Sequence, residues 1–210
     1  MCAKDDDGVG SAYGELFKFP ECGDTLFQLQ LQPIDEGIIL DDYIDGYKLA
    51  VDLLLERVSR PEAEAFLNRV RFPLLFLYRH HIELLLKSVI KHGSWIDGGN
   101  PPPSTHCLGD LWKTGRAAVE KHWPGVECDA LDATESCVQE LAKFDPNGTT
   151  FRYPTDKKGK PMLKDVDLSA YDLAHFRETA DRVSRFLGRC KGVLYEIAAD
   201  TWEPGEEFDI

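Results

Sequence analysis

One stretch of this sequence places charged side chains at helical spacing inside an apolar run. In YRHHIELLLK, Arg79, Glu83 and Lys87 are four residues apart and so share one face of a predicted helix. The simpler interpretation is an exposed stripe of ion pairs, each contributing only a few tenths of a kcal/mol. Because apolar residues flank the stripe on both sides, the alternative is a stripe that another helix covers, as an organising network or a site. With His80, these are the first candidate catalytic residues.

Arg116 and His122 are a second candidate catalytic pair, separated by five residues near the end of a predicted helix. An imidazole titrates near neutral pH and can move a 2′-hydroxyl proton, while a guanidinium can stabilise the charge that develops on phosphorus. The pair could therefore support metal-free RNA cleavage. Six positions turn a helix by about 600°, so the two side chains do not share a face cleanly.

The most basic part of the chain begins at the motif FRYP, residues 151–154, and continues through a lysine-rich loop. The last predicted helix adds three arginines on one face, and together these cations could contact a phosphate backbone. The alternative is that the lysines keep the loop soluble and the arginines pair with nearby acids. The candidate nucleic-acid-binding residues are Arg152, Tyr153, Lys157, Lys158, Lys160, Arg182, Arg185 and Arg189.

The composition is that of a soluble globular protein of 210 residues, 43% apolar, with a mean hydropathy of −0.32. The net charge of −13 argues against nucleic acid at first sight, but the acidic residues concentrate at the ends. Residues 1–56 hold thirteen acids and three lysines, residues 196–210 hold six acids and no base, and 57–195 carry a net +3. The acidic ends could compete with phosphate for the basic loop.

Other sequence features exclude several classes of protein. No apolar run approaches the roughly 20 residues of a membrane span, and the acidic start MCAKDDDG is unlike a signal peptide, so we expect a cytoplasmic protein. The six cysteines form no CxxC pair, and no nucleotide-binding, nucleophile-elbow or HExxH motif is present. We therefore expect no metal and no cofactor.

The pattern of apolar residues predicts a mainly helical protein. We expect an acidic, disordered tail at 1–12, a β-hairpin element at 13–40, a helical bundle at 41–200 and an acidic tail at 201–210. The helix from residue 43 is capped by Asp41 or Asp42, and Pro73 should kink or split the long second helix. Residues 149–165 are predicted to form a hairpin or a long loop with its tip at 157–159.

Three segments in this order resemble the HEPN-domain family: YRHHIELLLKSVIK at 78–91, HCLGDLW at 106–112 and FRYP at 151–154. That family often has His-Asp-Leu at the second segment, where this chain has Cys107 in place of Asp. The resemblance implies a bundle of four or five helices, usually dimeric, and in many members an RNase of toxin–antitoxin, abortive-infection or CRISPR systems. The family's catalytic signature is an Arg and a His with four to six residues between them, normally on the last core helix. Here the last helix has His175 ahead of Arg177, and only Arg116 and His122 have the spacing.

These observations lead to two hypotheses about a mainly α, HEPN-like bundle of five or six helices with a short N-terminal β-hairpin. In the first, a bacterial defence or toxin–antitoxin protein binds RNA or cleaves it without a metal, as a homodimer and with an antitoxin or another protein as partner. In the second, the chain is a non-catalytic dimeric scaffold for protein partners. Arg79, Glu83, Arg152 and Tyr153 would then form an internal network that ties the FRYP loop to the helix.

Overall fold

The computed structural model describes residues 36–60, 64–99, 104–163 and 172–201, and five α-helices account for most of them. They are α1 (Glu36–Val58), α2 (Glu64–Ile96), α3 (Leu108–His122), α4 (Cys128–Phe144) and α5 (Leu173–Thr201). This confirms the prediction of a mainly α bundle. The hairpin expected within 13–40 lies outside the described residues except for 36–40, which are helical, so α1 begins seven residues before the expected start at Tyr43.

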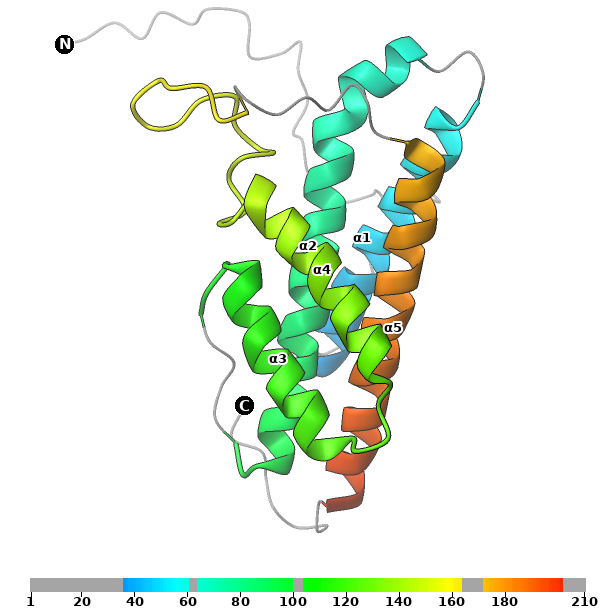
Figure 1. The fold of residues 1–210 in the computed structure, drawn as a ribbon, viewed down its shortest axis with the longest axis vertical. Helices are drawn as coiled ribbons and strands as arrows, with labels where there is room; N and C mark the ends of the chain where they lie inside the picture. Colours follow the sequence, from blue (N-terminus) through cyan, green and yellow to red (C-terminus); the bar gives the residue numbers. More distant parts are fainter. Residues whose placement is uncertain (1–35, 61–63, 100–103, 164–171, 202–210) are drawn as a thin grey trace, which may run out of the picture. The chain divides into compact units, whose positions relative to one another are not determined.

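Helix α2 is the centre of the bundle, because α1, α3 and α5 all pack against it (Figure 1). Helices α3 and α4, drawn in green, are joined by a short turn and run in opposite directions. The core consists of leucine, isoleucine and valine side chains that α2 shares with its neighbours, such as Ile82, Leu111 and Leu187. None of the helices in the described ranges is both long and apolar enough to cross a bilayer.

Pro73 lies inside α2 and does not divide it into two helices. Proline has no backbone N–H to donate to the preceding turn of the helix. When packing holds the residues on both sides in place, this loss bends the helix rather than ending it. Figure 1 shows the N-terminal part of α2 inclined to the rest of the helix. The continuous helix matters for the site, because it places residues 79–87 in the middle of the bundle.

The FRYP segment follows α4 in a loop, residues 145–163, that ends in a small hairpin. Thr155 and Pro161 form an isolated antiparallel bridge, and the tip contains Gly159 in a left-handed conformation (φ +78°). Over the residues described, this agrees with the prediction of a hairpin or a long loop with its tip at 157–159. Figure 1 shows this loop, in yellow, projecting away from the helices.

Candidate functional site

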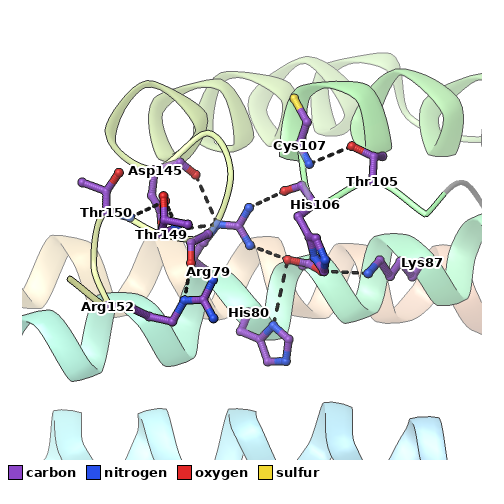
Figure 2. Close-up of polar contacts among 12 residues, drawn as sticks. Arg79, His80, Lys87, Thr105, His106, Cys107, Asp145, Thr149, Thr150 and Arg152 are labelled. Carbon is purple, nitrogen blue, oxygen red and sulfur yellow. Dashed lines mark hydrogen bonds and ion pairs between the residues drawn. The ribbon is translucent and has the colours of Figure 1, made fainter. Parts of the chain in front are cut away.

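The guanidinium of Arg79 is buried at the middle of α2 and joins three segments of the chain (Figure 2). Nη1 donates to Glu83 on the same helix, and Nη2 donates to the carbonyl of His106 just before α3. Nε donates to the carbonyl of Asp145 at the end of α4, at 3.2 Å, and lies 3.6 Å from the Asp145 carboxylate. Arg79 is only 1% exposed, so its role is to hold these segments together.

Asp145 organises the start of the FRYP loop from the other side of this contact. Its Oδ1 accepts hydrogen bonds from the amides of Thr149 and Thr150, at 2.7 and 2.9 Å. A bend of this kind requires Gly148, whose φ is +71° and where an added Cβ would lie 3.1 Å from Arg79 Nη1. The loop is thus folded around a buried carboxylate that faces a buried guanidinium.

Glu83 is the second buried acid, 1% exposed as a residue, and several donors surround its carboxylate. Oε2 accepts from Arg79, and Oε1 accepts from Lys87 Nζ at 2.8 Å and from His106 Nδ1 at 2.7 Å. Burial alone would raise the pKa of Glu83, but the interactions of its carboxylate with nearby His80, Lys87, His106 and Arg79 outweigh burial and hold the pKa well below its usual range. Glu83 is therefore ionised at any physiological pH.

The polar centre formed by Arg79, Glu83, Lys87, His106 and Asp145 opens to solvent on one side. The side chain of His106 is 66% exposed, whereas that of Lys87 is 24% exposed and that of Glu83 only 2%. Because a carboxylate accepts hydrogen bonds only, the contact at Nδ1 assigns the proton to that nitrogen and leaves Nε2 as an acceptor in the neutral ring. Chemically, this is a histidine oriented by a buried carboxylate, with an ammonium beside it.

His80 lies at the edge of the polar centre and contacts aromatic rings as well as charge. Its Nδ1 is 3.9 Å from Glu83, too long for a direct hydrogen bond. The ring stacks on Phe76 and meets the edge of Tyr47 on α1. The structure thus brings together four of the candidate catalytic residues, Arg79, His80, Glu83 and Lys87, at one place on α2.

Arg116 and His122 are bound to separate groups of acids. Arg116 pairs with Glu120, Asp132 and Glu135, which joins α3 to α4. His122 Nε2 lies 3.1 Å from Asp97 at the end of α2. No contact in the described residues joins these two side chains to each other or to the polar centre.

The candidate nucleic-acid-binding residues lie on two separate elements, and all of them are exposed. Within the described residues, no ion pair involves Arg152, Lys157, Lys158 or Lys160 on the loop, and none involves the arginines at 182, 185 and 189 on α5. Asp181, the acid that precedes Arg182 in the sequence, pairs with Lys48 on α1. Both groups of cations are therefore available for an external anion.

A cavity of about 530 Å³ lies between α2, α4 and α5, with walls formed mainly by leucine and phenylalanine side chains. Its ionisable members are Arg71, Glu140, Asp172 and His175, a mixture of basic and acidic groups that selects neither an anion nor a cation. In the ranges that the structure describes, no three His, Cys, Asp or Glu side chains are grouped to hold a metal ion. Of these features, the polar centre has the side chains best suited to acid–base chemistry.

Sequence reasoning did not single out His106, Asp145 or Gly148 as functional residues. A lone His beside Cys107 is more typical of a helix cap or a core residue than of a site, and Asp-Pro-Asn-Gly is typical of a helix end. The available signal was the succession of Asp, Gly and two threonines before FRYP, since an aspartate often accepts hydrogen bonds from amides a few residues later.

No family model matches the chain, and no curated protein or solved structure matches it either.

Proposed function

We propose that this chain binds RNA through the FRYP loop, residues 145–163, whose base the polar centre holds against α2. The observation that carries the proposal is the contrast between the two ends of this loop. Its base is folded around buried Asp145 and Arg79, whereas its outer part exposes four cations with no ion-pair partner in the described residues. A fixed base and free cations favour binding of a phosphate backbone, because little ordering is needed on contact.

A salt titration of RNA affinity tests this proposal. Replacing Lys157, Lys158 and Lys160 together with alanine should weaken binding and reduce the slope of log Kd against log salt by about 2, since each phosphate contact to a single strand contributes about 0.7. The matched control replaces Arg60, Arg69 and Lys113, three exposed cations elsewhere, and removes the same charge. Equal behaviour of the two triple variants would show that only net charge matters, and the proposal would then be wrong.

Within this proposal, His106 is the side chain that acts on the bound RNA. Its Nε2 takes the proton of a ribose 2′-hydroxyl, the 2′-oxygen bonds to the adjacent phosphorus, and the bond from phosphorus to the 5′-oxygen breaks. The imidazolium then returns the proton to the leaving 5′-oxygen, giving a 2′,3′-cyclic phosphate and a 5′-hydroxyl. Glu83 positions the ring, and Lys87 stabilises charge on the phosphate.

End-group analysis of RNA incubated with the purified protein checks this step. We expect cyclic phosphate ends from the wild-type chain and from His175→Ala, which removes an exposed histidine on α5. We expect none from His106→Ala. If the wild-type chain leaves RNA intact under conditions in which it binds, the chain binds RNA without cleaving it.

A dimeric scaffold is the second candidate function, and the outer face of α1 favours it. Leu49 and Leu53 lie one turn apart and are 60% and 58% exposed, an unusual exposure for two leucines on one helix face. Sedimentation of the wild-type chain and of Leu49→Asp/Leu53→Asp tests this candidate. A dimer that the double variant abolishes would support it, and a monomeric wild-type chain would exclude it.

A further inference from the structure

A continuous column of rings and one guanidinium runs across α2 from the FRYP loop to α1. Successive members are 4.5 to 6.4 Å apart, measured between ring centroids or from the guanidinium carbon to a ring centroid. In order, the members are Tyr153, Arg152, Phe76, His80, Tyr47 and Tyr43. We refer to them as the aromatic column.

The middle of the column is fixed by packing. The rings of Phe76 and His80 are nearly parallel, with an interplanar angle of 9°, and the ring of Tyr47 meets His80 at 83°. Arg152 lies between Phe76 and Tyr153, with its guanidinium carbon 5.6 Å from each ring centroid. Arg152 is also anchored by a hydrogen bond from Nε to the carbonyl of Gly148, so its position follows from the folded base of the loop.

The ends of the column are open to solvent. Tyr153 is 56% exposed and Tyr43 is 57% exposed, although both rings contact the next member of the column. A tyrosine that serves only to pack helices together buries most of its side chain, as Tyr78 does between α2 and α5 at 3% exposed. Both terminal tyrosines therefore leave more than half of their surface accessible to a ligand at the two ends of the column.

We propose that the aromatic column binds unpaired bases of single-stranded RNA, an inference that rests on the RNA binding proposed above. A base has a flat π-face that stacks on an exposed ring, and every base can do so without a sequence requirement. The cationic loop adjoins the Tyr153 end, so phosphates can lie on the lysines while bases stack on the exposed terminal tyrosines. Duplex RNA keeps its bases stacked internally and cannot use the column.

The test compares one fluorescent single-stranded RNA with the same RNA annealed to its complement. Tyr43→Ala and Tyr153→Ala should each weaken single-strand binding about tenfold, since one base–aromatic stack contributes about 1–3 kcal/mol. Binding of the duplex should not change. Tyr195→Ala is the matched control, because Tyr195 is 55% exposed on α5, and Tyr43→Phe, which keeps the ring, should bind as the wild type does.

The outcomes separate this inference from the proposal beneath it. Neither tyrosine substitution removes charge, so the salt dependence of binding should stay at the wild-type slope, unlike that of the triple lysine variant. If both tyrosine variants bind the single strand normally while the lysine variant still weakens binding, the column serves only to pack α1 and the FRYP loop on α2, and this inference is wrong. If the lysine variant also binds normally, the proposed function itself fails.

Discussion

Replacing Arg79 with methionine should destabilise the protein far more than any exposed arginine does. The substitution keeps an unbranched side chain of similar length but removes every donor. Glu83 retains Lys87 and His106, whereas the carbonyls of His106 and Asp145 and the Asp145 carboxylate lose the donor that faces them. Breaking a buried ion pair from one side costs about 3–5 kcal/mol, and each orphaned buried acceptor costs about 1–3 kcal/mol within that total.

Arg116→Met provides the control for this prediction. Arg116 pairs with three carboxylates, more than Arg79 does, but its side chain is 25% exposed and its partners lie in water. If the number of ion pairs decided stability, Arg116 would contribute more than Arg79. If burial decides it, Arg116 contributes much less, because exposed ion pairs contribute only about 0–1 kcal/mol.

Urea denaturation followed by circular dichroism measures both variants. We expect the free energy of unfolding to fall by at least about 3 kcal/mol for Arg79→Met and by less than about 1 kcal/mol for Arg116→Met, at unchanged m-values. In a domain of this size, the first loss corresponds to a drop in Tm of roughly 6–20 °C. Equal losses for the two variants would refute the reasoning, because they would show that burial does not decide the strength of these contacts.

Two further predictions concern the loop and the response to acid. Gly148→Ala should cost about 2–3 kcal/mol in urea unfolding and Gly159→Ala only about 1 kcal/mol, because both glycines have positive φ but only an added Cβ at 148 meets Arg79. A similar cost for both would mean that the close approach of Arg79 is unimportant. Burial lowers the pKa of His81 and of His92 to about 4, below the value of about 6.5 in an unfolded chain. As the pH falls below 6.5, the unfolded state therefore binds protons that the folded state does not bind. Stability should therefore fall between pH 7 and pH 5, by about 2 kcal/mol for each histidine, and a chain with His92→Phe should lose about half as much as the wild type. An unchanged pH dependence in that variant would show that His92 is not the titrating group.

The helices were predictable because each one carries its own local signal. Apolar residues at helical spacing and breaks such as Trp-Pro-Gly and Asp-Pro-Asn-Gly identify α3 and α4 to within a few residues. Two boundaries were not predictable in this way. Helix α1 begins before its apparent Asp cap, and α2 passes through Pro73, since tertiary packing outweighs local preference at both positions.

The polar centre was only half predictable, for a physical reason. The spacing of Arg79, Glu83 and Lys87 gave a stripe on one helix, and the flanking leucines indicated that something covers it. The covering partners are a backbone carbonyl of His106 and one carbonyl and one carboxylate of Asp145. A carbonyl belongs to every residue, so no sequence pattern can show which one a buried arginine will use.

The contacts of Glu83 couple the fold of the loop to the orientation of the His106 ring. The same carboxylate receives Arg79 from the buried side and His106 from the exposed side. Arg79 in turn is held by Asp145, which orders the residues before FRYP. A change at Asp145 should therefore alter the orientation of His106 without contacting it. If an apolar pair replaced Arg79 and Glu83, it could fill the same volume, but it would leave the FRYP loop and the histidine unconnected. The stabilising and positioning roles of this ionic centre are thus separable, and the second explains why charge is buried here at all.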